Sequence, residues 1–339
     1  MKSWRTFSIH KANKTLIWAA LTGLTALAAV LSLCLGAVPV SLGDTLGALL
    51  GRTSGTQAQI VLYSRLPRTC GCLLAGMSLA VSGTVIQAVL GNPMAAPNII
   101  GVNAGAGFMV ALLGAAAPVA VAAVPLAAFL GALLGVMLVL FIAERTGASK
   151  LTLILAGMAV SAIFSAGIDA VVTFAPDALP GYSDFRIGSL ANLTMAKLAP
   201  AFWIILIALT LVLSLAGELD VLMLGRDVSQ SLGLRVKPMR LLLLTLAAAL
   251  AGAAVSFCGL LGFVGLIAPH IMRRLLGEES RTLILGSAMG GAAMLTTCDL
   301  LGRVLFAPFE LPVGILLSFV GGPFFIILLL RQRGERIHD

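Results

Sequence analysis

The sequence predicts an all-α polytopic membrane protein with about ten transmembrane helices, and three observations support this fold class. Of the 339 residues, 59% are hydrophobic and only 11% are charged, whereas a soluble domain carries about 25% charged residues. The mean hydropathy is +1.07. Apolar segments recur from Leu16 to Leu330 without a long polar block between them. We therefore expect a single transmembrane domain that spans residues 1–339.

The apolar segments, with the Gly and Pro residues that break them, predict where each crossing lies. One crossing takes about 20 residues, so the longest uncharged run, 69–143, holds three helices with their turns. The eighth expected crossing is only half as long as a bilayer requires, so we expect a broken or re-entrant helix shielded by protein. The first follows a basic arm but is too long for a signal peptide, and we expect it to be a transmembrane helix. The expected crossings are 16–38, 67–90, 99–115, 119–143, 151–174, 198–216, 241–258, 267–276, 282–301 and 312–330.

The positions of Lys and Arg predict the orientation. Ten crossings place both termini on the same side, and a cytoplasmic location for that side puts most of the 22 Lys and Arg residues inside, as the positive-inside rule requires. The charges lie between apolar runs and not on one basic face with aromatic residues, so the net charge of +8 does not indicate a nucleic-acid binder. The basic residues left outside are Arg52, Arg65, Arg68, Arg186, Lys197 and Arg303.

Glycine is abundant, with 37 residues, and it recurs in small-xxx-small spacing. Such spacing lets helix backbones approach closely where lipid provides no hydrophobic driving force. We therefore expect close helix packing at the pairs Gly101/Gly105, Gly131/Gly135 and Gly286/Gly290.

The sequence contains no recognisable catalytic, metal-binding or nucleotide-binding motif. Its three histidines, His10, His270 and His338, are far apart, and no HExxH or GxxxxGK[ST] pattern occurs. If transport is driven by ATP, the ATPase is therefore another polypeptide. The five cysteines form no CxxC pair, and we expect small buried side chains at Cys34, Cys70, Cys72, Cys258 and Cys298.

Asp169 is the one acid that this topology places well inside a crossing. A carboxylate within the membrane is functional by default because its burial costs several kcal/mol. Asp169 also lies only a turn or two from the expected outer end of its helix, where it could reach water. A proton relay, a substrate contact and a water-exposed carboxylate all remain open.

A basic motif, Arg65-Leu-Pro-Arg68, precedes the second crossing. Pro67 suits the first turn of a helix. Two arginines on the side that the positive-inside rule depletes of positive charge indicate an anionic partner, and lipid phosphate is the alternative.

A second motif, at about 220–235, lies in the longest cytoplasmic loop. Leu224, Val228 and Leu232 form one apolar stripe at helical spacing, and glycines bound the segment at Gly225 and Gly233. This pattern predicts a short amphipathic helix. It either lies on the membrane surface or inserts into a groove of a partner protein.

Further motifs follow in a fixed order along the chain. They are SG…Q…NPMAAP at 82–97, SLG at 231–233, GFVGLIAPHIMR at 262–273, DLLGR at 299–303 and ELPVG…GGPFF at 310–325. With RLPR, these blocks span 65–331. Because the blocks occur in the same order as in the FecCD-type permeases, the chain resembles that family, the membrane subunits of ABC importers for iron-siderophores, haem and cobalamin. The resemblance implies the ABC importer permease fold of the cobalamin/siderophore type.

The resemblance also implies an assembly. Two permease subunits, identical or similar, surround a central pathway, with two ATP-binding cassette ATPase subunits on the cytoplasmic side and a periplasmic or lipid-anchored substrate-binding protein on the other. ATP and Mg are bound by the partner ATPase, and neither a cofactor, a metal nor a catalytic residue is expected in this chain. The implied location is the bacterial cytoplasmic (inner) membrane, with both termini cytoplasmic.

At the positions that match the family's motifs, the resemblance implies three sets of functional residues. Docking of the binding protein is implied for Arg65, Arg68 and Arg303. Coupling to the ATPase is implied for Gly225, Arg226, Asp227, Val228, Gln230, Ser231, Leu232 and Gly233. Gating is implied for Asn92, Met94 and Ser149. By contrast, His270 next to Pro269 is interpreted as a structural, helix-breaking element, since no second His or carboxylate is near it in sequence.

An iron-siderophore is the expected cargo, followed by haem or cobalamin. The chain departs from the family pattern at Met94, at Ala268 and at 185–190, which lacks a Trp before Gly-Ser-Leu, and these departures bear on the substrate. Two other classes of function stay open, an ion-coupled secondary transporter that uses Asp169 and a purely structural membrane subunit.

Overall fold

The computed structural model describes residues 11–146 and 150–336, and within them every regular element is a helix. In chain order the elements are α1 (Lys11–Cys34), α2 (Leu42–Leu49), α3 (Thr56–Gln59), η1 (Ile60–Arg65), α4 (Leu66–Leu90), η2 (Pro97–Ile100), α5 (Val102–Ala116), η3 (Val121–Ala123), α6 (Val124–Arg145), α7 (Lys150–Phe174), η4 (Pro176–Ala178), α8 (Leu179–Ile187), α9 (Met195–Ser214), α10 (Ala216–Met223), α11 (Arg226–Ser231), α12 (Val236–Cys258), α13 (Val264–Leu276), α14 (Ser280–Val304) and α15 (Val313–Arg336).

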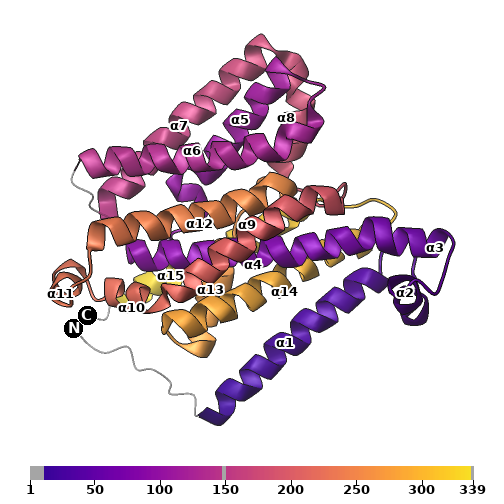
Figure 1. Cartoon of the computed structure of the whole chain (residues 1–339), viewed down its shortest axis with the longest axis horizontal. Helices are drawn as coiled ribbons and strands as arrows, with labels where there is room; N and C mark the ends of the chain where they lie inside the picture. Colours follow the sequence, from indigo (N-terminus) through magenta and orange to yellow (C-terminus); the bar gives the residue numbers. More distant parts are fainter. Residues whose placement is uncertain (1–10, 147–149, 337–339) are drawn as a thin grey trace.

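The long helices form one bundle in which the predicted crossings recur in order (Figure 1). Within the described residues, seven helical segments are long and apolar enough to cross a membrane, and α5 and α15 supply shorter apolar helices. The expected half-length crossing is confirmed as α13, a helix of 13 residues. The predicted membrane fold with about ten membrane helices is therefore confirmed.

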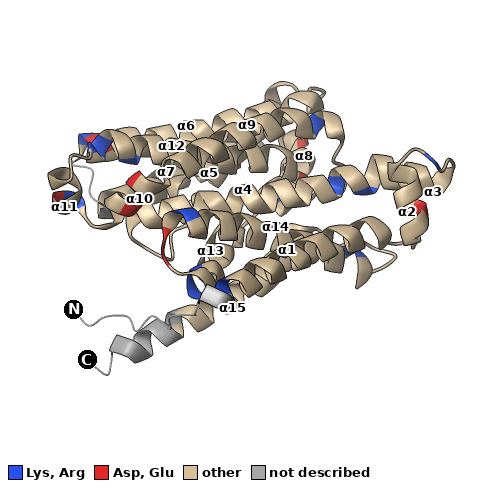
Figure 2. Ribbon diagram, turned by 60° about the horizontal axis from the view of Figure 1, so that its bottom comes forward, with Lys and Arg blue, Asp and Glu red and all other residues tan. Residues whose placement is uncertain are grey.

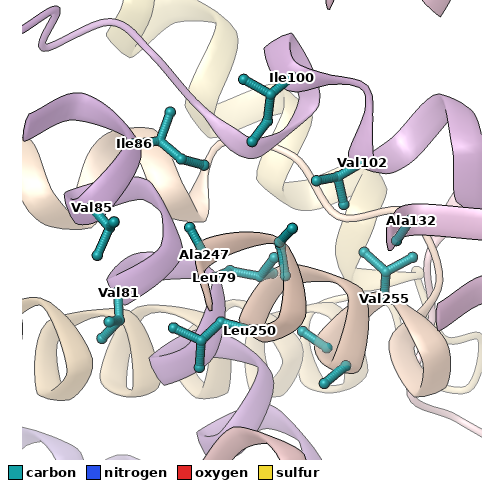
Figure 3. Packing of buried hydrophobic residues seen from close by; sticks show 14 of the residues in the cluster. Leu79, Val81, Val85, Ile86, Ile100, Val102, Ala132, Ala247, Leu250 and Val255 are labelled. Carbon is teal, nitrogen blue, oxygen red and sulfur yellow. The ribbon is translucent and has the colours of Figure 1, made fainter. Parts of the chain in front are cut away.

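Helix α4 lies at the centre of the bundle and α1 at its edge (Figure 1). In the most apolar part of Thr56–Leu90, 83% of the residues are buried, compared with 17% in α1. In Figure 3, Leu79 of α4 lies beside Ala247 and Leu250 of α12, and the three side chains belong to the main hydrophobic cluster. Two buried serines of α4 also donate hydrogen bonds to α12, from Ser78 Oγ to the Leu250 carbonyl at 2.6 Å and from Ser82 Oγ to the Ala247 carbonyl at 2.7 Å. Such polar contacts join helices that lipid does not press together.

Glycines set the closest helix approaches, as the small-xxx-small spacing predicts. A methyl group added at Gly105 of α5 would overlap the carbonyl of Gly131 in α6. The pair Gly286 and Gly290 of α14 instead receives the side chains of Met272 and Leu276 from α13. The glycines therefore allow the backbones of α5 and α6 to come close together, whereas in α14 they make room for side chains of α13.

Charged residues gather at the two ends of the bundle, and the long helices between them are largely uncharged (Figure 2). One end carries α2, α3 and the C-terminal ends of α1 and α14, and we call it the arginine-cluster end. The other carries α10, α11 and the N-terminal ends of α1 and α14, and we call it the α11 end (Figure 1). The candidate functional residues lie mainly at these two ends.

Candidate functional sites at the two ends of the bundle

At the arginine-cluster end, two arginines cap the C-terminus of α1. The last carbonyl groups of a helix have no partner within the helix. Arg65 Nη1 donates to the carbonyls of Leu33 at 2.9 Å and Cys34 at 2.6 Å, and its Nη2 donates to that of Val38. From α14, Arg303 Nη2 donates to Ser32 Oγ at 2.7 Å and to the Ser32 carbonyl at 3.3 Å. The guanidinium groups satisfy the orphan carbonyls and also meet the negative end of the helix dipole.

A buried carboxylate holds the remaining charges together. Arg68 Nε lies 3.0 Å from Asp299 Oδ2, and Arg68 Nη2 donates to Asp299 Oδ1 at 3.0 Å, a bidentate contact. Arg303 Nε lies 3.1 Å from Asp299 Oδ2, an ion pair whose angle does not make a hydrogen bond. Arg68 Nη1 also donates to Glu310 Oε2 at 2.6 Å. We call Arg65, Arg68, Asp299, Arg303 and Glu310 the arginine cluster.

The structure brings the three predicted docking arginines together but buries them. Arg65, Arg68 and Arg303 are 4%, 5% and 3% exposed, because each is used to join helices α1, α4 and α14. In this subunit they do not present an open basic surface. Glu310, which pairs with Arg68, has a side chain that is 42% exposed, so this carboxylate is the part of the cluster that is accessible at the surface. The docking role of these arginines stays a prediction.

Sequence reasoning named Asp299 and Glu310 only as parts of motifs and gave them no role. Asp169 is exposed on α7 near the end of that helix, as the alternative of a carboxylate close to the outer end expected, but it is not the one acid inside a membrane helix. Asp299 lies within α14 and is only 1% exposed. The signal was present in the sequence, since Asp299 and Arg303 are four residues apart, a spacing that places them side by side on a helix.

At the α11 end, the predicted amphipathic segment is present but is not one helix over about 220–235. It consists of α10 and the short α11, which meet at Gly225. The φ angles of +100° at Gly225 and +84° at Gly233 lie in the left-handed region that favours glycine. The two glycines therefore end the helices and fix the direction of α11.

One face of this segment is anchored and the other is free. Ser229 is buried, and its Oγ donates to the carbonyls of Val221 at 2.7 Å and Gly225 at 2.6 Å, which ties α11 to α10. The predicted apolar stripe faces away from the subunit, with Leu224, Val228 and Leu232 exposed by 59%, 47% and 61%. Arg226, Asp227, Gln230 and Ser231 are exposed beside it. An exposed apolar stripe with a polar rim is the form that a contact surface takes.

The predicted gate residues lie in the turn after α4. Gly91 ends α4 in the left-handed conformation, and Asn92 Oδ1 then accepts a hydrogen bond from the Met94 backbone N–H at 3.0 Å. This side-chain turn directs the chain toward η2. Asn92 and Met94 are both half-buried. Ser149 lies outside the described residues, and the gate stays a prediction.

His270 packs edge-on against an aromatic ring. Its ring centroid lies 5.8 Å from that of Phe324, so it joins α13 to α15. Among the described residues no group of three His, Cys, Asp or Glu side chains could hold a metal ion.

Comparisons with known proteins agree on one family. The model of the FecCD transport family matches residues 24–331. The hemin transport system permease protein HmuU of Yersinia pestis is 38% identical over 84% of this chain and 87% of its own length. The achromobactin transport system permease protein CbrC of Dickeya dadantii is 38% identical over 90% of this chain and 88% of its own. The Fe(3+) dicitrate transport system permease protein FecD of Escherichia coli is 36% identical over 90% of this chain and 95% of its own length.

A solved structure has the same fold. It is an inward-facing conformation of a metal-chelate type ABC transporter, with a TM-score of 0.80 and 30% sequence identity, covering 93% of this chain and 99% of that chain.

Proposed function

The chain belongs to the FecCD transport family, and on this basis we propose that it is the permease subunit of an ATP-binding cassette importer for a metal chelate. The observation that carries the proposal is the family match over residues 24–331, together with similarity to metal-chelate permeases along nearly the whole chain. An iron-siderophore is the proposed cargo and haem the next, because the relatives are described as transporting achromobactin, Fe(3+) dicitrate and hemin. Cobalamin is a third candidate.

The proposed assembly contains two such permease subunits, two ATPase subunits and a substrate-binding protein. ATP and Mg bind to the ATPase, and this chain acts as a transport subunit without catalysis of its own. The exposed apolar stripe of α11 supports the ATPase contact, since any ATP-driven motion must enter this chain through another subunit. Residues 1–339 are proposed to form one permease domain.

The proposed location is the bacterial inner membrane, with the α11 end in the cytoplasm. The distribution of Lys and Arg supports this orientation. The arginine-cluster end then faces outward, where the binding protein docks. Because Arg68 is already paired with Glu310, we propose that an acid of the binding protein meets Arg68 by displacing Glu310. Asn92, Met94 and Ser149 are proposed to form the inner gate.

Co-purification tests the proposed partners. The chain is expressed together with a cognate ATPase and binding protein, extracted in detergent and captured by a tag on this chain. We expect both partners to be retained, the binding protein in a salt-sensitive way because its contact is ionic. Capture of this chain without the ATPase at low salt would contradict the proposal.

A further inference from the structure

The N-terminus of α14 is capped by a residue that lies sixty positions earlier in the chain. The Ser280 backbone N–H donates to Asp220 Oδ1 of α10 at 2.9 Å. The first N–H groups of a helix have no partner within it, and a carboxylate there also meets the positive end of the helix dipole. Asp220 therefore joins α10 to the start of α14.

Helix α10 is held firmly between the other elements. Leu219 is fully buried and Leu222 nearly so, and α10 packs against both α4 and α14. On its other side, Ser229 binds α11 to the Val221 carbonyl of α10. Ser229 therefore connects α11 to α10, and Asp220 connects α10 to α14.

Helix α14 reaches from this contact to the opposite end of the bundle. Its 25 residues span about 37 Å. Near its C-terminus it carries Asp299 and Arg303, which bind Arg68 of α4 and the C-terminus of α1. One helix thus contacts α10 at one end and carries two residues of the arginine cluster at the other.

We propose that Asp220 is a positioning residue that couples the motion of α11 to α14, and so connects the ATPase contact with the arginine cluster. This rests on the proposed function, in which α11 receives the ATPase. Coupling between distant sites is carried by rigid elements whose contacts differ between two states. The Asp220–Ser280 contact is the polar joint in that path, and its loss leaves ATPase binding intact while hydrolysis no longer drives uptake.

Two substitutions remove this joint from opposite sides. Asp220→Ala removes the acceptor. Ser280→Pro removes the donor, and proline is tolerated at the first position of a helix, where the ψ of +119° at the preceding Glu279 suits it. Asp220→Asn keeps an acceptor oxygen and serves as the conservative variant, and Glu218→Ala, on the same helix, is the matched control.

The assembled importer is reconstituted in liposomes, and three quantities are measured: ATPase retention, ATP hydrolysis, and cargo taken up per ATP. For Asp220→Ala and Ser280→Pro we expect retention and hydrolysis within about twofold of wild type and a fall in uptake per ATP of about fivefold or more. We expect Asp220→Asn to keep most of the wild-type uptake per ATP, and Glu218→Ala to leave the uptake per ATP unchanged.

The inference is overturned if both variants keep the wild-type ratio, or if both lose the ATPase, which would make Asp220 a scaffold for α11. Failure of the proposed function is a different result, in which the wild-type assembly itself shows no ATP-dependent uptake.

Discussion

Asp299 holds together the charges at the arginine-cluster end. It is 1% exposed and contacts Arg68 and Arg303, which are also buried. Removing one partner of a buried ion pair leaves an uncompensated charge, which costs more than the pair itself contributes. The stability of this end therefore depends on one carboxylate within a membrane helix.

Replacing Asp299 with Asn is expected to destabilise the protein by about 3–5 kcal/mol, because two buried guanidinium groups lose their shared negative charge. Thermal unfolding in detergent measures the effect. The control is Asp169→Asn, which changes an exposed side chain and is expected to shift stability by about 0.5 kcal/mol or less. Equal effects for the two variants would show that the Asp299 contacts are dispensable.

Glu310→Gln tests whether the binding protein meets Arg68. If an acid of the binding protein displaces Glu310, removing the competing carboxylate strengthens association by several fold, most clearly at low salt. Titration of the binding protein onto the permease in nanodiscs gives the dissociation constant. Asp44→Asn, which alters a half-buried acid of α2 at the same end, is the control. Unchanged or weaker association in Glu310→Gln would place docking elsewhere.

The membrane-crossing helices could be predicted from the sequence because lipid imposes a minimum length and a high hydropathy on each of them. The glycines at 225 and 233 predicted the ends of α11, but the sequence did not predict that the residues just before Gly225 belong to a separate helix, α10. Nor could it predict the Asp220 cap on α14, because that contact joins residues sixty positions apart. Contacts of this kind arise from the packing of whole helices and leave no local pattern.

Leu232→Asp tests the contact surface of α11. The side chain is 61% exposed in the subunit, so we expect membrane insertion and folding to be unchanged, with stability within about 0.5 kcal/mol of wild type. A charge buried in an apolar interface without a partner costs several kcal/mol, so ATPase retention is lost. Pull-down in detergent measures it, with Leu232→Met as the control that keeps the apolar surface. Retention of the ATPase by Leu232→Asp would mean that α11 lies on lipid, and the turn at 277–279, between Arg273 of α13 and Arg281 of α14, would become the next candidate.

Gly76→Ala tests the close approach of α4 and α14. The added methyl group would overlap the carbonyl of Gly291, which forces the two backbones apart at a cost of about 1–3 kcal/mol. Gly23→Ala, in α1, meets no atom within 4 Å and is expected to stabilise its helix by up to about 1 kcal/mol. Thermal unfolding of the two variants side by side shows the contrast. A Gly76→Ala protein as stable as Gly23→Ala would rule out backbone contact between α4 and α14.

In the assembled bundle the two ends differ in their surfaces and share the same long helices. The α11 end offers an exposed apolar stripe, and the arginine-cluster end is closed by internal ion pairs. The family resemblance anticipated which residues gather at each end, but it did not anticipate that the arginines are buried. Burial follows from α1, α4 and α14 meeting at one point, which only the assembled bundle defines.

We propose that this chain moves a metal chelate inward with energy from a partner ATPase. This transport is tested most directly by uptake of a radiolabelled iron-siderophore into liposomes that contain the chain, its ATPase and the binding protein. We expect uptake that requires ATP and all three components and that an imposed proton gradient cannot replace. Uptake by this chain alone, driven by the gradient and abolished in Asp169→Asn, would instead establish an ion-coupled transporter.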